Sequence, residues 1–279
     1  MKSLCVIGLG LIGGSIIKDI KLKKLAEVIY AFDKNANSLE KAKAAGWIDH
    51  AIDDFNDIKD IKPDLIIVAT PINSTAKILF NLALEESLSN SILTDTASAK
   101  GFIYEQLKDI KVKNIVLSHP MAGSHNAGFD ASKEDLFNNK KTIIVDAFKI
   151  DSENLAKVEQ LWQKLGSETI KMNVDEHDYA VAYASHLPHL IAFGLADAIK
   201  NEANSNINES SAGGLKEFLR IAASDPDMWT DILITNKEAI INSLNQFNTS
   251  IENLLKNTQS VEDLKSSLYE IKKFKEDKF

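Results

Sequence analysis

The sequence predicts an α/β fold in which a doubly wound, largely parallel sheet over residues 1–171 is followed by an all-α C-terminal domain over residues 172–279. Three observations lead to this prediction. From Ser3 to about Lys171, short apolar runs alternate with helical patterns, which is typical of βαβ units. A glycine-rich turn directly follows the first apolar run. After about Met172 no convincing strand appears, and long helical stretches take over.

Each expected strand is a short run rich in apolar residues and bounded by turn-forming or polar residues. The expected strands are Leu4–Gly8, Val28–Phe32, Leu65–Ala69, Ser91–Thr94, Ile115–Ser118, Thr142–Val145 and Glu168–Lys171. Amphipathic helices lie between them, for example over Ser38–Ala45 and Ser152–Leu165. The next residue in each case is a glycine, Gly46 or Gly166, which can close a helix in the left-handed conformation.

The second half contains the helical stretches 175–200, 211–223, 226–256 and 260–275. In the third of these, apolar residues recur three and four positions apart from Leu233 to Leu255, as on one helix face. No repeat, proline-rich linker or low-complexity tract separates the two halves. We therefore expect a packed junction, and a cleft between packed domains is a common place for a ligand.

Composition excludes several classes of protein. The hydrophobic fraction of 44% and charged fraction of 26% are ordinary for a soluble globular chain. The net charge of −8 argues against a nucleic-acid partner or an anionic membrane surface. No run of about 18 apolar residues exists, so no membrane span is expected. The single cysteine, Cys5, cannot form an internal disulfide, which favours a reducing, cytoplasmic location.

The glycine-rich turn has the pattern G-x-G-x-x-G and opens a helix directly after the first strand, which predicts a Rossmann-type dinucleotide site. Its glycines allow a tight turn, a close approach of the backbone to a pyrophosphate, and close packing of the helix on the strand. The start of the helix also offers free N–H groups to the phosphates. The residues expected to bind the cofactor here are Gly8, Leu9, Gly10, Leu11, Ile12 and Gly13.

Asp33 indicates which cofactor to expect. It ends the second strand 25 residues after Gly8, where a carboxylate can hydrogen-bond both hydroxyls of a ribose. The same carboxylate repels a 2′-phosphate, and no arginine stands nearby to receive one, so we predict NAD rather than NADP. The alternative is a glycine-rich turn with no cofactor, in which Asp33 caps a helix.

Three polar segments follow later strands and should meet at the carboxyl edge of the sheet, where ligands bind in such folds. They are Ala69-Thr70-Pro71, residues 95–100 and residues 118–124. We expect Thr70 and Pro71 to contact the cofactor.

His119 is the histidine that this arrangement places beside a nicotinamide. A neutral imidazole there can accept a proton from an alcohol as hydride leaves the same carbon. Ser98 could orient the imidazole or bind the same hydroxyl. The alternative is that His119 merely ends a strand before Pro120.

The helical half carries three histidines that could suggest a metal site, because His186 and His189 lie three residues apart on one face and His177 precedes them. No cysteine or helical carboxylate triad accompanies them, so we expect no metal and allow that two of them only pack helices.

Arg220 is the single arginine among 32 basic residues, the others being lysine. Apolar residues within 215–221 predict that its helix is buried. A buried arginine needs a carboxylate, which could come from Glu217, from another acid, or from a substrate held by the bidentate fork that lysine cannot form.

These motifs, taken in order, resemble the prephenate and arogenate dehydrogenases of tyrosine biosynthesis over essentially the whole chain. The matching segments are G-L-G-L-I-G-G-S at 8–15, V-A-T-P at 68–71, D-T-A-S-A-K-G at 95–101, H-P-M-A-G at 119–123, S-H-L-P-H at 185–189 and R-I-A-A-S-D-P-x-M-W at 220–229. Many dehydrogenases share the glycine pattern, whereas the ordered set with the last two motifs is specific.

The resemblance, most of all to prephenate dehydrogenase, implies NAD-dependent oxidative decarboxylation of prephenate to 4-hydroxyphenylpyruvate, without a metal. It implies that His119 is the base on the ring hydroxyl and that Ser98 binds the same hydroxyl. It further implies that Arg220 anchors a substrate carboxylate, and that His189 and Ser124 contact the substrate. Trp229 resembles a tryptophan that reaches the site of a partner subunit, which implies a homodimer formed through the helical domain.

One departure and several alternatives remain open. Position 125 is histidine where many relatives carry an acid, so His125 could alter the pH dependence or the response to tyrosine. Arogenate is the nearest alternative substrate. A β-hydroxyacid dehydrogenase or an imine reductase of the same architecture is less favoured, because those enzymes are expected to carry a lysine or aspartate on the helix that here carries His186 and His189. A non-catalytic NAD-sensing protein would leave Ser98, His119 and Arg220 without a reason to coexist.

Overall fold

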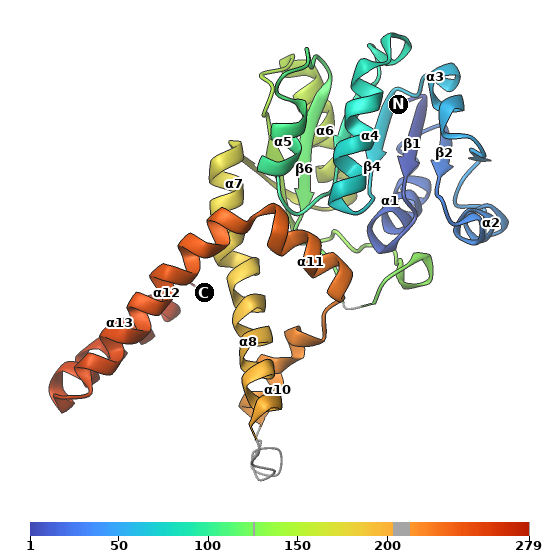
Figure 1. The fold of residues 1–279 in the computed structure, drawn as a ribbon. Helices are drawn as coiled ribbons and strands as arrows, with labels where there is room; N and C mark the ends of the chain where they lie inside the picture. Colours follow the sequence, from blue (N-terminus) through green and yellow to red (C-terminus); the bar gives the residue numbers. More distant parts are fainter. Residues whose placement is uncertain (125, 203–212, 279) are drawn as a thin grey trace.

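The N-terminal half is built on one eight-stranded sheet with the order β3-β2-β1-β4-β5-β6-β7-β8 (Figure 1). The computed structural model describes residues 1–124, 126–202 and 213–278. All neighbouring strands are parallel except β6 and β7, which are antiparallel. The strands are β1 Ser3–Ile7, β2 Val28–Phe32, β3 His50–Ala51, β4 Leu65–Val68, β5 Ile92–Asp95, β6 Ile115–Pro120, β7 Lys141–Val145 and β8 Glu168–Met172.

Helices cover both faces of this sheet because alternate strand residues point to opposite sides. In β1, Leu4 and Val6 join a core cluster with α1 (Leu11–Leu22), α2 (Ala36–Ala44) and α6 (Ser152–Leu165), whereas Cys5 and Ile7 join a second cluster on the other face. That second cluster contains residues of α3 (Ile58–Ile61), α4 (Ile72–Leu84) and α5 (Gly101–Leu107). The predicted doubly wound sheet is confirmed.

Two features of the sheet were not predicted. The strand β3 has two residues, too few for a periodic pattern, and its His50 stacks on Tyr30 of β2 with ring centroids 5.1 Å apart. The antiparallel pair β6 and β7 arises because the described residues between the two strands hold a short 3₁₀ turn, Phe129–Ala131, and no crossover helix.

The C-terminal half, within its described part, is helical beyond β8. Its elements are α7 Val174–Val181, a π-helical turn Ala182–His186, α8 Leu187–Asn201, α10 Gly213–Leu219, a 3₁₀ turn Arg220–Ala223, α11 Pro226–Thr235, α12 Lys237–Asn257 and α13 Val261–Lys278. The stretch expected as one helix over 226–256 is therefore two helices. They part at the buried Asn236, whose side chain donates to the carbonyl of Asp178 and also pairs with His186.

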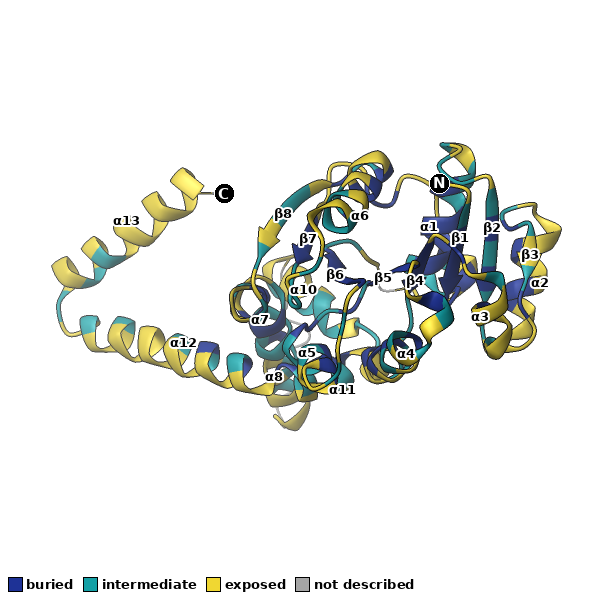
Figure 2. Ribbon diagram, turned by 90° about the horizontal axis from the view of Figure 1, so that it is seen from above, coloured by how far each residue is buried: buried dark blue, intermediate teal, exposed yellow. Residues whose placement is uncertain are grey.

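The two domains meet at the edge of the sheet that carries the carboxyl ends of the parallel strands. The arrows of β1, β4 and β6 point toward α8, α10 and α11 (Figure 1). Asn73 of α4 donates to Asp231 of α11 across this junction at 2.7 Å. By contrast, α12 and α13 diverge from their connection as an arm with mostly exposed residues (Figure 2). Among the described helices, none is long and apolar enough to cross a membrane.

Candidate functional site

The glycine turn connects β1 to α1 and has the geometry of a pyrophosphate cradle. Gly8 has a φ of +95°, and a Cβ there would lie 2.6 Å from the carbonyl oxygen of Ala69. A Cβ on Gly13 would lie 1.9 Å from the carbonyl oxygen of Gly8. A Cβ on Gly10 would meet nothing within 4 Å in the parts of the chain that the structure describes. Packing therefore requires two of the glycines, while the third leaves open space at the start of α1, where a phosphate can approach the backbone.

Asp33 lies directly after β2 and is held against this turn. Its two carboxylate oxygens accept hydrogen bonds from the backbone N–H groups of Leu9 and Asn35. Each oxygen keeps a lone pair for a further donor such as a ribose hydroxyl. The alternative in which Asp33 caps a helix is wrong, because the cap of α2 is Asn35, whose side chain accepts from the backbone of Asn37.

The segment of Thr70 and Pro71 packs beside the glycine turn, between β4 and α4. The Thr70 methyl group is among the atoms nearest to a Cβ built on Gly8. The Thr70 and Thr75 hydroxyls are 2.9 Å apart, and Thr75 also donates to the Thr70 carbonyl. Side-chain hydrogen bonds thus hold this loop at the expected edge of the sheet.

His119 lies in β6, one residue beyond the expected end of that strand, and its side chain is buried. Its Nδ1 lies 2.9 Å from Nε2 of His177, the Nδ1 of which lies 2.7 Å from a carboxylate oxygen of Asp178. Burial is the main cause that lowers the pKa of His119 well below its ordinary value of 6.5, and charge on Lys100, His177 or His186 would act in the same direction. A neutral imidazole at neutral pH is the form that can act as a base.

Lys100 joins the end of β5 to β6 at Ser118, the residue before this histidine. Its fully buried ammonium group lies 2.6 Å from the Asp95 carboxylate and donates to the carbonyls of Ala97 and Ser118 at 2.9 and 2.6 Å. Burial lowers the pKa of Lys100, and the charge of Asp95 opposes that shift. The half-buried Ser98 lies in the loop that this lysine holds to the strand of His119.

The S-H-L-P-H segment forms the π-helical turn and the start of α8. Nδ1 of His189 lies 2.9 Å from the carbonyl oxygen of Ser185, which can only accept, so Nδ1 carries the proton and Nε2 is left for another partner. The three histidines of the helical half have separate hydrogen-bond partners: His177 pairs with His119, His186 with Asn236, and His189 with this carbonyl.

The Trp229 side chain is buried and packs against other residues of its own chain. It is 4% exposed and stacks on His189 with ring centroids 3.9 Å apart and an interplanar angle of 21°. Its indole Nε1 is buried without a hydrogen-bond partner in the described ranges. His186, His189 and Phe193 contact the ring, and the expectation that Trp229 reaches a partner subunit stays a prediction.

Arg220 is exposed, so the expectation of a buried arginine is wrong. The preceding helix α10 buries none of its residues, and its Phe218 is 41% exposed. No acid of residues 1–124, 126–202 or 213–278 pairs with Arg220, Glu217 included. Its charge contributes, after burial, to lowering the pKa of His189. The charge of Arg220 therefore acts on His189, and among the described residues no acid occupies the guanidinium group, so it can bind an anion.

Ser124 is not brought to His119 by any hydrogen bond between described residues. It is exposed and exchanges hydrogen bonds with the backbone of Asn126. His125, the departure noted in the sequence, lies outside the described residues.

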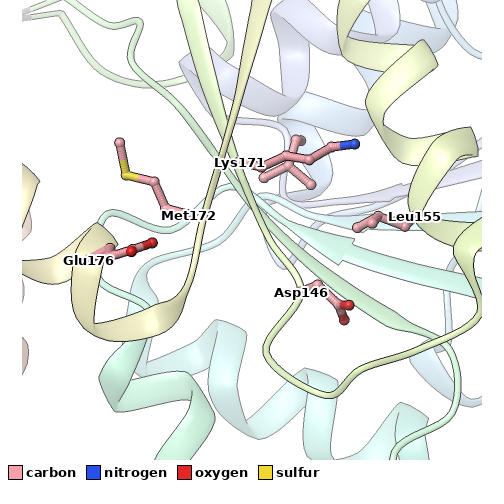
Figure 3. A pocket seen from close by; sticks show the side chains of 6 residues that line it. Asp146, Leu155, Lys171, Met172 and Glu176 are labelled. Atoms are coloured by element: carbon pink, nitrogen blue, oxygen red, sulfur yellow. The ribbon is translucent and has the colours of Figure 1, made fainter.

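A separate pocket of about 180 Å³ lies at the far edge of the sheet (Figure 3). It is lined by Ile144, Asp146, Leu155, Lys171, Met172 and Glu176. None of these is a predicted site residue.

Sequence reasoning missed what Asp178 and Lys100 do and left His177 without a role. Lys100 stood inside a recognised motif, and His177 and Asp178 are adjacent at the start of the helical half. His177 contacts His119, and Asp178 contacts Lys100, across about 60 to 80 residues of sequence. Hydrophobic periodicity along the sequence cannot predict such contacts.

Comparisons with known proteins cover nearly the whole chain. The family model described as "Prephenate dehydrogenase, nucleotide-binding domain" matches residues 16–171, and "Prephenate dehydrogenase, dimerization domain" matches residues 173–271. The chain is 32% identical to a prephenate dehydrogenase of Bacillus subtilis over 88% of this chain and 67% of that protein. It is 29% identical to a cyclohexadienyl dehydrogenase of Zymomonas mobilis over 91% of this chain and 87% of that protein.

Among solved structures, the prephenate dehydrogenase of Aquifex aeolicus, in complex with hydroxyphenyl propionate and NAD⁺, superposes with a TM-score of 0.92. The two sequences are 31% identical, and the alignment covers 99% of this chain and 98% of that one.

Proposed function

Because this chain belongs to the prephenate dehydrogenase family, we propose that it oxidises prephenate with NAD, giving 4-hydroxyphenylpyruvate, carbon dioxide and NADH. The observation that carries the proposal is the burial of the His119 imidazole, which lowers its pKa, at the carboxyl edge of the sheet that bears the glycine turn. A base at this edge can take a proton from a substrate alcohol while a nicotinamide takes the hydride.

The residues of the glycine turn fit NAD. The open space at Gly10 suits a pyrophosphate at the N-terminus of α1, and the lone pairs of Asp33 suit the ribose hydroxyls. The remaining proposed contacts are Gly8, Leu9, Leu11, Ile12, Gly13, Thr70 and Pro71. When bound, NAD would accept the hydride that leaves the ring carbon of the substrate. The NAD⁺ bound to the Aquifex aeolicus relative supports this choice of cofactor.

His119 takes the proton of the ring hydroxyl at its Nε2 as a carbonyl forms on that carbon. Ser98, in the loop held by Lys100, binds the same hydroxyl and orients it. Loss of carbon dioxide is driven by aromatisation of the ring and needs no separate acid. A base and a clamp for the substrate carboxylate are therefore sufficient.

Arg220 and His189 form the proposed substrate side of the site. The guanidinium of Arg220, which pairs with no acid among the described residues, suits the planar, bidentate grip of a carboxylate. His189 is held by the Ser185 carbonyl and by stacking on Trp229, so its Nε2 has a defined direction. We propose that Trp229 contributes by holding His189, and that Ser124 contributes from the loop after β6.

We further propose a homodimer formed through the helical domain, with residues 1–171 and 172–279 as the two domains. The family description of residues 173–271 as a dimerization domain and the exposed apolar side chains of α12 and α13 support the dimer. The single cysteine, which is buried and unpaired, supports a cytoplasmic location.

The decisive experiment follows NADH appearance at 340 nm with purified protein, NAD and prephenate, with NADP and arogenate in parallel reactions. We expect turnover with prephenate and NAD. Faster turnover with arogenate would assign the alternative substrate, and equal use of NADP would remove the role given to Asp33. Absence of turnover with both substrates would leave an NAD-binding protein without this activity.

A further inference from the structure

Asp178 determines which atom donates in each hydrogen bond of the series Asp178, His177 and His119. This carboxylate accepts the backbone N–H groups of Lys100 and Gly101, both at 2.8 Å. Burial would raise the pKa of Asp178, but the hydrogen bonds from His177 and from these two N–H groups outweigh it and keep the pKa low. The carboxylate is therefore ionised and can only accept. Nδ1 of His177, 2.7 Å away, must carry a proton.

The same reasoning determines the second ring. Burial lowers the pKa of His177, with Lys100 acting in the same direction and Asp178 and Asp95 opposing it. A neutral His177 with its proton on Nδ1 presents a bare Nε2. His119 Nδ1, 2.9 Å away, must then donate to it. The free nitrogen of His119 is thus Nε2, and it has a lone pair.

We propose that His177 is a positioning residue which, held by Asp178, keeps His119 in the tautomer that can accept the substrate proton. This inference rests on the proposed function and adds to it a residue of the helical domain. As His119 takes the proton at Nε2, its Nδ1–H stays bonded to His177, and the Asp178 carboxylate behind that ring stabilises the positive charge. His119 on β6 is held in this tautomer only when α7, which carries His177, packs against the sheet.

The charged and titratable groups around His119 and His177 come from every element packed against these two rings. Lys100 and Asp95 lie on the β5 side, Asp178 lies beside His177 on α7, and His186 lies in the π-helical turn. Lys100 and Asp95 form an ion pair at 2.6 Å, and His186 is bonded to Asn236. Asp178 is therefore the group that sets the proton positions.

The tautomers can be read directly by NMR on NAD-saturated protein labelled with ¹⁵N-histidine, using single-histidine variants to assign the six histidines. We expect His119 and His177 each to carry the proton on Nδ1 and to have a bare Nε2. A proton on Nε2 of His119 would overturn the proposal. This measurement needs no turnover, so its failure is distinguishable from failure of the proposed function.

Two substitutions at His177 separate the two contacts. In His177→Asn the amide is near the former Nδ1, so Asp178 keeps a donor while His119 loses its acceptor. In His177→Gln the amide oxygen can reach the former Nε2 and accept from His119. We expect kcat for prephenate to fall about 10- to 100-fold in His177→Asn and to recover at least severalfold in His177→Gln. The KM and the NAD dissociation constant should stay within about twofold.

The pH profile distinguishes positioning from packing. In His177→Asn the protonated His119 loses an acceptor, so the acidic limb of kcat/KM should move to lower pH, and His177→Gln should move it back. His50→Asn, on the edge strand β3, is the control and should match the parent in rate and profile. Circular dichroism checks folding. Turnover of His177→Asn within threefold of the parent, or equal losses in both variants with an unmoved acidic limb, would mean that His177 only packs.

Discussion

Some residues of the site are proposed to act on the substrate, and others hold those residues in position. His119 is buried on a central strand, whereas Arg220 is exposed on a short turn of the helical domain. The first needs a low dielectric to remain a neutral base, and the second needs access to an anion. The two environments therefore suit the two proposed tasks.

Replacing His119 with asparagine should remove the base while leaving the cofactor site intact. General bases typically contribute about 10²- to 10⁴-fold to a rate, so we expect kcat to fall within that range or below detection. The NAD dissociation constant, measured by fluorescence titration, should stay within about twofold. Near-normal turnover of His119→Asn would contradict the assignment.

Arg220→Lys keeps the charge but removes the planar fork. Because the fork would bind the substrate equally in the ground and transition states, we expect KM for prephenate to rise about 10-fold or more, with a smaller change in kcat. Lys216→Met on the preceding helix α10 is the control for loss of general positive charge. An unchanged KM in Arg220→Lys would mean that the guanidinium does not bind the carboxylate.

Among the elements, the β1 turn shows how one motif serves both packing and binding. Gly10→Ala adds a methyl group to open space, so the free energy of unfolding should change by about 1 kcal/mol or less, while NAD should bind at least 10-fold more weakly. Gly13→Ala places the same group 1.9 Å from a carbonyl oxygen and should destabilise the fold itself. Urea unfolding and NAD titration of both variants make the comparison. Unchanged NAD affinity in Gly10→Ala would contradict the cradle.

The π-helical turn makes stability depend on pH through His186. Burial lowers the pKa of this buried histidine to about 4, whereas an unfolded histidine titrates near its ordinary value of 6.5. Between these values the unfolded chain binds the proton and the folded chain does not, so stability is lost as pH falls below 6.5. Urea unfolding at pH 7 and pH 5 should give a loss about 2 kcal/mol smaller in His186→Asn than in the parent. Equal losses would contradict the neutral, buried state.

Sequence patterns identified the elements better than the contacts between them. The strands and most helices follow from periodicity because burial repeats along each element. The division at Asn236 could not be predicted, since apolar spacing continues across it and the cause is a hydrogen bond to Asp178. Likewise, the burial expected for Arg220 was inferred from apolar neighbours that remain only partly covered. The residue types and motif positions of His119 and Asp33 predicted their place in the site. The roles of His177, Asp178 and Lys100 depend on contacts between segments that only the folded chain brings together.

At the scale of the whole molecule, α13 exposes a row of apolar side chains, whereas the start of α12 packs against α7, α8 and the π-helical turn. Val261, Leu264, Leu268 and Ile271 recur three and four residues apart on α13, and three of them are at least half exposed, at 83, 51 and 50% for Val261, Leu268 and Ile271. Such an exposed apolar stripe on a helix is typical of a surface that packs against another helix.

We therefore expect light scattering to give a mass twice that of the 30.8 kDa chain. Leu268→Glu combined with Ile271→Glu places charges in the stripe and should shift the protein toward monomer, because buried unpaired carboxylates are costly. Lys273→Glu, on the same helix but outside the stripe, should leave the mass unchanged. The double variant should still bind NAD, since the glycine turn lies on the other domain. A dimer that survives the double substitution would place the interface elsewhere on the helical domain.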